Sequence, residues 1–208
     1  MSTRLNNMLI EKKVEEYINE VDSISPAPGG GSVASLVGAL GVSLARMLGH
    51  FSIEKKKFKE ASNKKKNRFI LAFKELSHYK DMLIKGIDDD AISYECVVDA
   101  FKSKEEERIQ KALLTSALVA FDMQEASKKA LTNVKMLIEL GNKNLYSDLI
   151  SSAILLACCN EMASLNVVAN ASMIKDEKIK EHYLTTSALL VKQSKLLKNQ
   201  IIRSINKI

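Results

Sequence analysis

The segment SPAPGGGSVASLVGALG, residues 25–41, decides the fold of this 208-residue chain. Its two prolines push the residues before them toward extended conformations, and three glycines follow directly. From Val33 to Leu48, apolar residues recur at helical spacing while most other positions hold Ala, Gly or Ser. A helix without a polar face is typical of a protein core. The segment therefore predicts a stiff connection, a glycine turn and a buried helix.

Further helices are expected on both sides of this segment, because apolar residues recur there at helical spacing too. The expected ranges are 9–21, 55–87, 91–101, 105–140, 147–172 and a last helix that begins at about residue 175. Between the second and third of these we expect a break or kink, at Gly86 and the acidic run Asp88 to Asp90. The helix over 147–172 is again rich in small residues on most faces.

The scarcity of turn residues excludes a β-protein. The chain has 2 Pro and 8 Gly, and both Pro and three of the Gly fall within residues 26–31, which leaves little punctuation for the turns that strands need. Its 46% hydrophobic and 27% charged content is typical of a globular protein. We therefore predict an all-α, single-domain bundle of six to seven helices over residues 1–208, two of them buried and rich in small residues.

Cysteine usage and the apolar stretches predict the compartment and the assembly. Three cysteines, two of them adjacent at Cys158 and Cys159, with no CxxC pair and no secretory leader, indicate a reduced, cytoplasmic protein. Arg46 and Glu161 interrupt the two long apolar stretches, so we expect no membrane span. Two helices without a polar face are hard to bury in a monomer of this size, which favours a homodimer.

Basic residues and histidines point to no nucleic acid and no metal. The net charge of +6 comes largely from residues 55–66 and 192–207, and a solvated lysine surface explains both regions. There is no Trp and no helix-turn-helix or RNP-like pattern, so we expect no nucleic-acid partner. His50, His78 and His182 lack a second His three or four positions away, so no metal site is predicted.

The turn Gly29-Gly30-Gly31-Ser32 is a candidate binding element. Three glycines before a buried helix allow close backbone approach and expose the first N–H groups of the helix, which suits an anion or a polar heterocycle. A tight loop that needs positive φ explains the glycines equally well. The pattern matches neither GxGxxG nor GxxxxGK[ST], so a nucleotide fingerprint is excluded.

Three motifs together resemble one family. The segment 25–41 is similar to the signature of the formiminotransferase-cyclodeaminase C-terminal domain and of its stand-alone bacterial relatives, the cyclodeaminase/cyclohydrolase family. DDDAISYECVVDAFK, residues 88–102, resembles the acidic motif of that family. GNKNLYSD, residues 141–148, with Leu165-Asn166-Val167 further on, resembles its third signature, and Lys55 to Phe58 fits its basic run.

The resemblance implies an all-helical homodimer that acts on one-carbon units bound to tetrahydrofolate, with no tightly bound cofactor and no metal. Formiminotetrahydrofolate cyclodeaminase, which forms methenyltetrahydrofolate and ammonia, is the first expectation. Methenyltetrahydrofolate cyclohydrolase is the alternative, and a folate-binding dimer without turnover or a structural dimer are further ones. Phe121-Asp122-Met123 stands where the family often has an aliphatic-Pro-Leu step, and Ser103-Lys104 where it has Leu-Pro-Lys. These departures leave the choice of activity open.

Two acidic residues are the catalytic candidates under this resemblance. Asp90 best matches the acidic motif, and adjoining Asp88 and Asp89 are expected to raise its pKa, which suits a group that moves protons between the folate nitrogens and the leaving amine. Helix capping by the three aspartates is the alternative. Asp148 is the second candidate, and its alternative is a cap on the helix that begins nearby.

Substrate binding is assigned to three groups under the same resemblance. Gly29, Gly30, Gly31 and Ser32 offer backbone N–H groups, and Lys55, Lys56 and Lys57 face the negatively charged glutamate tail of folate, including its polyglutamylated form. Asn144 and Asn166 can hydrogen-bond a pterin edge, or else satisfy buried backbone.

Overall fold

The computed structural model describes residues 8–207, so residues 1–7 and 208 of the predicted domain lie outside the described part. Every regular element in the described part is helical, which confirms the all-α class. The elements are η1 (Leu9–Glu11), α1 (Val14–Val21), α2 (Gly30–Ile53), α3 (Lys56–Lys59), α4 (Asn63–Ser103), α5 (Glu106–Leu137), η2 (Lys143–Leu145), α6 (Tyr146–Ala171) and α7 (Glu177–Ile205).

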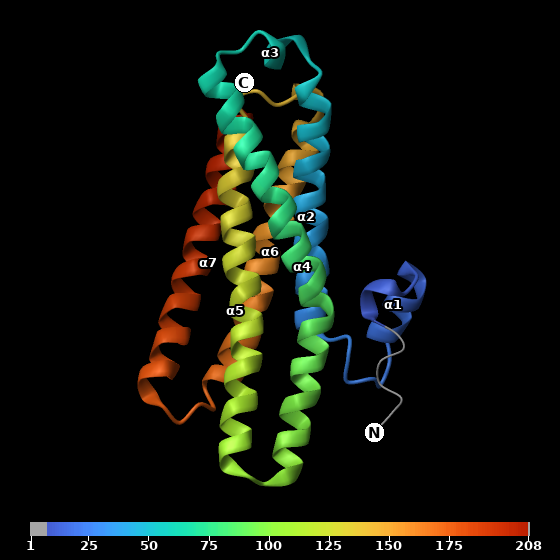
Figure 1. Cartoon of the computed structure of the whole chain (residues 1–208), viewed down its shortest axis with the longest axis vertical. Coiled ribbons are helices and arrows are strands. Elements are labelled where there is room, and N and C mark those ends of the chain that lie inside the picture. The colour runs from blue at the N-terminus through green and yellow to red at the C-terminus, as the bar shows by residue number, and fades with distance from the viewer. Residues whose placement is uncertain (1–7, 208) are drawn as a thin grey trace.

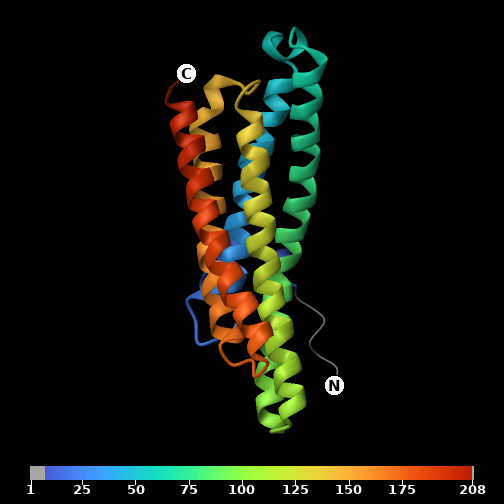
Figure 2. The same cartoon turned by 90° about the vertical axis from the view of Figure 1, so that its left-hand side faces the viewer.

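Five long helices form the body of the molecule. Helices α2, α4, α5 and α6 run along its long axis, with α7 packed against α5 and α6 (Figures 1 and 2). Helix α1 stands off the bundle near the N-terminal end of α2, and the short α3 caps the opposite end (Figure 1). The predicted site residues fall into two groups, one near each end of α2.

Small residues in α2 allow close packing against its neighbours. A Cβ added at Gly38 would lie 2.7 Å from Cys159 Sγ of α6, and one added at Gly41 would lie 3.1 Å from Leu155 Cβ. The buried positions of α2 are otherwise mostly Ala and Ser, with Val42 and Leu48 as larger core residues. Helix α2 is thus a core helix, as its lack of a polar face predicts.

Helix α4 runs without a break through Gly86 and Asp88 to Asp90, so the predicted break there is wrong, whereas the alternative, a kink, is compatible with a continuous helix. A Cβ at Gly86 would overlap Ser35 Oγ of α2, and that hydroxyl donates to the carbonyl of Leu83 (2.6 Å). The glycine is therefore used for close approach of two helices rather than for a turn. Because the three aspartates lie in the helix interior, capping does not explain them.

The start of α2 also differs from the expectation. Gly29 is the N-cap residue, and Gly30 and Gly31 already belong to the first turn of the helix. No glycine in residues 8–207 has positive φ, so the reading of this segment as a tight loop that needs positive φ is wrong. The glycines are instead explained by what packs against them.

Two stretches are long and apolar enough to span a membrane by length and composition alone: Gly30–Ile53 and Lys143–Ala171, each with a mean hydropathy of 1.5. In the bundle 56% and 44% of their apolar windows are buried, and core helices of soluble proteins pass the same test. The absence of a membrane partner stays a prediction. Part of each stretch is exposed, including Leu40 of α2 and Ile154 and Leu165 of α6.

A buried polar network ties three helices together. Gln124 of α5 and Asn160 of α6 are fully buried. The Asn160 amide donates to the Gln124 carbonyl (2.7 Å) and to Ser127 Oγ (3.1 Å), and the Gln124 amide donates to the carbonyls of Asn160 (3.2 Å) and Ser187 of α7 (3.4 Å). The network fixes the register of α5, α6 and α7, because each buried donor needs its partner.

Replacing Asn160→Ala is expected to lower the free energy of unfolding by roughly 1 to 3 kcal/mol, because buried partners lose their hydrogen bonds. The matched control is Thr115→Ala, which removes an exposed hydroxyl that bonds only the carbonyl of Lys111 in its own helix. Urea unfolding of both variants measures the difference. Equal stability of the two variants would show that the network contributes nothing.

Candidate functional site

A pocket of about 260 Å³ lies at the N-terminal end of α2. Four helices line it: Gly29 to Gly31 begin α2, Asp90 comes from α4, Ser116 from α5, and Asn166 and Asn170 from α6. The structure therefore brings together the predicted residues Gly29, Gly30, Gly31, Asp90 and Asn166. Asn170 was not predicted, although its position four residues after Asn166 places it on the same helix face.

The first turn of α2 packs directly on the Asp90 carboxylate. A Cβ added at Gly31 would overlap all three atoms of that carboxyl group, whereas one added at Gly30 would meet nothing within 4 Å. Ser32 Oγ donates to Asp90 Oδ2 (3.0 Å). Gly31 and Ser32 thus hold the carboxylate in one place, the first by leaving room for it and the second by bonding it.

The pKa of Asp90 is raised above its ordinary value by burial, and the hydrogen bonds from the Ser32 side chain and backbone partly offset this rise. The expectation that the adjoining Asp88 and Asp89 raise the pKa of Asp90 is therefore wrong, because burial is the cause. A carboxyl group with a raised pKa in a pocket is suited to accepting and returning a proton.

Tyr17 of α1 was missed by the sequence analysis. The expected apolar face of this helix, at Val14, Ile18 and Val21, is exposed, and Tyr17 is the buried residue of α1. Burial, with the charges of Asp90 and Asp88, raises the pKa of Tyr17 to about 12. The sequence pattern did not predict the burial of Tyr17, because a single aromatic residue creates no helical periodicity. It anchors the N-terminal segment against the acidic stretch of α4.

The N-terminal segment has a second attachment to the same stretch. The backbone N–H of Leu9 in η1 donates to Asp88 Oδ1 (2.5 Å), and Asp88 is buried. The side chain of Lys12, which follows η1, pairs with Glu20 of α1 (2.8 Å). Residues 9–21 therefore cover part of α4 beside Asp90.

The other predicted site residues lie at the opposite end of α2. Lys55, Lys56 and Lys57 belong to or precede α3, and Asn144 lies in η2. Helix α2 has 24 residues, so its ends are about 36 Å apart at 1.5 Å per residue. A single chain does not bring these residues to Asp90.

Asp148 also lies at that end, in the first turn of α6, and is half-buried. The helix begins at Tyr146 with Leu145 as N-cap and without a side-chain cap, so the alternative that Asp148 caps this helix is wrong. Asn144 is exposed, and its backbone N–H donates to Asn142 Oδ1 (3.2 Å). Burial, followed by the charge of Lys143, lowers the pKa of Lys57.

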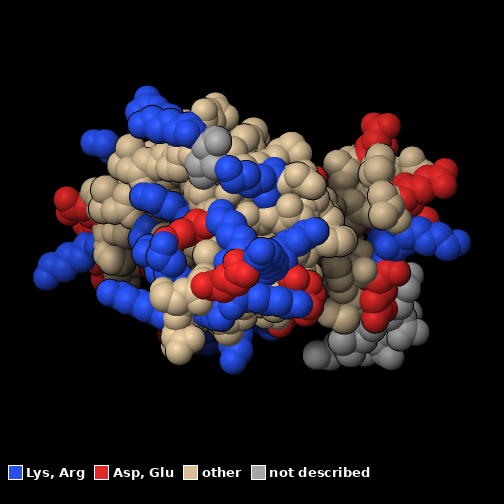
Figure 3. Space-filling view, turned by 90° about the horizontal axis from the view of Figure 1, so that it is seen from above, with Lys and Arg blue, Asp and Glu red and all other residues tan. Residues whose placement is uncertain are grey.

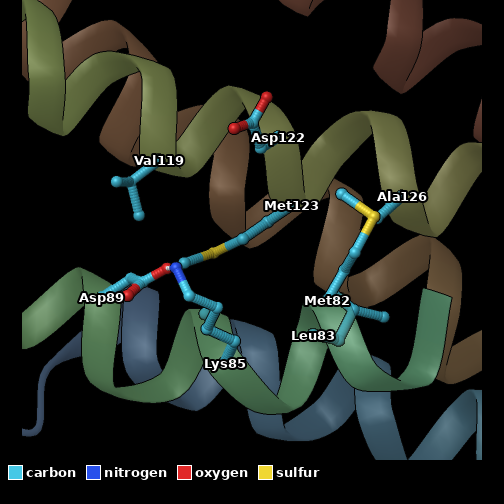
Figure 4. A pocket seen from close by; sticks show the side chains of 9 residues that line it. Met82, Leu83, Lys85, Asp89, Val119, Asp122, Met123 and Ala126 are labelled. Atoms are coloured by element: carbon cyan, nitrogen blue, oxygen red, sulfur yellow. Dashed lines mark hydrogen bonds and ion pairs between the residues drawn. The ribbon is translucent and has the colours of Figure 1, made fainter. Parts of the chain in front are cut away.

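A second, smaller pocket of about 140 Å³ lies between α4 and α5. Lys85 and Asp89 of α4 form an ion pair there (2.6 Å), and Asp122 of α5 lines the same pocket (Figure 4). Burial raises the pKa of Asp122, and the charge of Glu125 adds to the rise. Asp122 and Met123, which belong to the segment that departs from the family pattern, line this pocket. The pocket shares no lining residue with the pocket at Asp90.

No group of three or more His, Cys, Asp and Glu side chains within residues 8–207 is placed to hold a metal ion. The absence of a metal stays a prediction. What the main pocket offers is one half-buried carboxyl group, the hydroxyl of Ser116, two asparagine amides and the N–H groups of a helix start. Fold and pocket together define an all-helical protein with a polar pocket at one end of its bundle.

Comparison with known proteins identifies the family of this all-helical protein. The model of the family formiminotransferase-cyclodeaminase matches residues 13–188, and the chain belongs to that family. The resemblance predicted from the sequence is thereby confirmed. The matched residues include the glycine segment, Asp90, Asp148 and both asparagines of the pocket.

Relatives and one solved structure show the extent of the likeness. The chain is 29% identical to chicken formimidoyltransferase-cyclodeaminase over 90% of its own length but only 36% of that protein. It is 27% identical to the methenyltetrahydrofolate cyclohydrolase of Methylorubrum extorquens, over 92% and 95% of the two chains. The crystal structure of formiminotetrahydrofolate cyclodeaminase from Thermotoga maritima matches with a TM-score of 0.86 and 26% identity, over 95% and 97%. The chain thus spans about a third of the vertebrate relatives.

Proposed function

We propose that this chain is a formiminotetrahydrofolate cyclodeaminase that uses Asp90 as its proton-transfer group. The observation that carries the proposal is the Asp90 carboxyl group, which lines the pocket, has a raised pKa from burial and is held by the start of α2. The likeness to the Thermotoga maritima cyclodeaminase over nearly the whole of both chains supports the same activity.

The reaction needs one proton to move from the attacking folate nitrogen to the leaving amine nitrogen of the formimino group. The second folate nitrogen attacks the carbon of the protonated formimino group (C=NH2+) and forms a C–N bond, the π pair of the C=N bond moves to the formimino nitrogen, and the Asp90 carboxylate accepts the proton of the attacking nitrogen. Asp90 then donates the proton to the amino group, and the C–N bond to this group breaks with its electron pair, releasing ammonia. The remaining carbon is the methenyl cation, whose charge the ionised carboxylate stabilises.

Other groups in the pocket are assigned to binding. The asparagines Asn166 and Asn170 present amides to a pterin edge, although each also donates to the backbone of its own helix. The N–H groups at Gly30 and Gly31 face the same space. The substrate is a folate, including its polyglutamylated form, and the protein is cytoplasmic with no tightly bound cofactor, no metal and no nucleic-acid partner.

The chain acts as a homodimer. Leu40 and Phe51 of α2 are 52% and 58% exposed, and Ile154 and Leu165 of α6, which line a groove with residues of α7, are 48% and 70% exposed. We call the outer surface of these two neighbouring helices the α2–α6 face. Its run of exposed apolar residues is the kind of surface that a second copy buries.

Methenyltetrahydrofolate cyclohydrolase is the second candidate. It is favoured by the Methylorubrum extorquens relative, which has this activity in its name and matches over 95% of its length. Both reactions pass through a tetrahedral carbon between two folate nitrogens, so the same carboxyl group serves either one. Only a measurement of turnover with each substrate distinguishes the two activities.

A spectrophotometric assay with two substrates tests the proposal. Purified protein is mixed with formiminotetrahydrofolate or with methenyltetrahydrofolate, and the methenyl absorbance is followed against the uncatalysed rate. We expect faster appearance of methenyl from the formimino substrate. Acceleration of methenyl loss alone would establish the cyclohydrolase, and no acceleration with either substrate would leave a protein that binds folate without turnover or a structural dimer.

A further inference from the structure

Two serine hydroxyls connect the backbone of Asp90 to a neighbouring helix in the main pocket. Ser93 lies one turn after Asp90 in α4, and its Oγ donates to the Asp90 backbone carbonyl (2.9 Å). The same Oγ lies 3.2 Å from Ser116 Oγ of α5. Both serines are buried, and Ser116 lines the pocket whereas Ser93 does not. Ser116 therefore stands in the pocket wall two hydrogen bonds away from the backbone of Asp90.

The direction of these hydrogen bonds follows from the number of protons. A serine hydroxyl has one proton and two lone pairs, and a backbone carbonyl can only accept. The proton of Ser93 therefore goes to the Asp90 carbonyl, which is the nearer of its two partners. The bond between the two serines then needs the proton of Ser116. Because that proton is used, Ser116 turns a lone pair to the pocket and is an acceptor there.

The asparagines of the pocket are oriented in a similar way. The side-chain nitrogen of Asn166 donates to the carbonyl of Met162 (3.4 Å), and that of Asn170 donates to the carbonyl of Asn166 (3.0 Å). Each amide is thereby left with its oxygen to accept a hydrogen bond from a ligand. Together with the Asp90 carboxylate, the walls from α4, α5 and α6 present acceptors, and the N–H donors lie at the start of α2.

The charge of the pocket favours a cation. Among the described residues that line it, Asp90 is the one charged side chain. Lysines and arginines crowd the α3 end of the bundle instead, as the view from above shows (Figure 3). A positively charged group whose polar hydrogens are all donors therefore matches the three acceptor walls.

The protonated formimino group is a group of this kind. Its nitrogen carries two protons and no lone pair, so it can only donate. In 5-formyltetrahydrofolate an oxygen replaces this nitrogen, and the oxygen can only accept. To bond that oxygen, Ser116 must turn its proton into the pocket and give up its bond to Ser93. The formyl compound therefore loses one hydrogen bond that the formimino compound keeps.

We propose that Ser116 is a specificity-determining residue, which accepts a hydrogen bond from the protonated formimino nitrogen and disfavours a formyl oxygen. Ser93 is its positioning residue, because it holds the Ser116 proton away from the pocket. The proposal rests on the proposed function, since it places a formimino group at Asp90. A site built to bond one polar group discriminates strongly against an analogue that cannot make the same bond.

Selectivity between these two ligands tests the role of Ser116. Formiminotetrahydrofolate is measured by kcat/KM, and 5-formyltetrahydrofolate is measured as a competitive inhibitor by its Ki. Ser116→Ala is expected to lower kcat/KM by about 10- to 100-fold, the usual effect of losing one hydrogen bond to a charged group. The Ki stays near the wild-type value, because the formyl oxygen gains no net hydrogen bond from Ser116.

Ser93→Ala changes the selectivity in a different way. It leaves the pocket lining intact and removes the partner that holds the Ser116 proton. Ser116 can then donate to the formyl oxygen without losing a bond, so we expect the Ki of 5-formyltetrahydrofolate to fall by about tenfold. The matched control is Ser194→Ala in α7, which removes a buried hydroxyl away from the pocket. We expect wild-type selectivity from the control, and thermal unfolding shows that all three variants are folded.

A merely structural role of either serine weakens both ligands alike. An equal change of kcat/KM and of affinity for the formyl compound in Ser116→Ala, or selectivity of Ser93→Ala equal to that of the control, would therefore overturn the proposal. Lack of turnover in the wild type would instead contradict the proposed function. Titration calorimetry then gives the Kd of both compounds. Tighter binding of the formimino compound that Ser116→Ala abolishes would support the contact, and equal or no binding of the two compounds would overturn it.

Discussion

Gly31→Ala is expected to lower the turnover of formiminotetrahydrofolate by about 100-fold or more. The added methyl group would overlap the Asp90 carboxyl group, so Asp90 must move away from the place where Ser32 holds it. A displacement of about 1 Å of a reacting group is enough for a loss of this size. The measurement is kcat/KM from the rise of methenyl absorbance.

Gly30→Ala is the matched comparison, because it adds the same methyl group one residue earlier in the same helix turn. Nothing lies within 4 Å of its Cβ, so it narrows the pocket without touching Asp90. We expect its loss of kcat/KM to be at least tenfold smaller than that of Gly31→Ala. Thermal unfolding of both variants checks that the difference does not come from misfolding. Equal losses would mean that the contact with Asp90 is unimportant.

Asp90→Asn is expected to lower kcat by about 10² to 10⁴-fold, the usual contribution of a positioned acid–base group. The amide preserves the shape of the carboxyl group but cannot accept and return the proton. Asp89→Asn is the control, since Asp89 is partly exposed and pairs with Lys85 away from the main pocket. We expect near wild-type turnover from the control. Near-normal turnover of Asp90→Asn would remove the residue from the mechanism.

Because the pKa of Asp90 is raised, Asp90→Asn is also expected to change how the free energy of unfolding depends on pH. A carboxyl group whose pKa is higher in the folded than in the unfolded state stabilises the fold while it is protonated, and this stabilisation is lost as the pH rises through the folded-state pKa. The neutral amide avoids that loss. Above that pH, Asp90→Asn is expected to be at least as stable as the wild type while being far less active. Because the mechanism begins with the carboxylate, wild-type kcat/KM falls as the pH drops through the same pKa.

Sequence periodicity predicted the class and most helices correctly because packing in this bundle follows helical spacing. The buried helix from Val33 to Leu48 was expected, and the structure adds only its first and last turns. The wrong break at Gly86 has a physical reason: a glycine needed for a turn and one needed for contact with Ser35 look alike in a sequence. The same ambiguity produced the loop expected at Gly29 to Gly31.

The part of the candidate site that belongs to local sequence motifs could be predicted from the sequence. The glycine segment, Asp90 and Asn166 were expected and lie at one pocket, because each belongs to a motif that the sequence displays directly. Tyr17 was not, since its burial depends on where the N-terminal segment lies relative to Asp88 and Asp90. The position of Asp148 and the lysines relative to Asp90 depends on which end of each helix faces which, and local spacing carries no information on that.

The most direct test of cyclodeaminase activity through Asp90 is to measure ammonia and methenyl together in one reaction. Wild-type protein and Asp90→Asn are each incubated with formiminotetrahydrofolate, with methenyl followed by absorbance and ammonia by a coupled enzyme assay. We predict equal amounts of both products from the wild type, formed faster than without protein, and background rates from Asp90→Asn. Methenyl and ammonia formed at the uncatalysed rate by the wild type, or equally fast by both proteins, would contradict it.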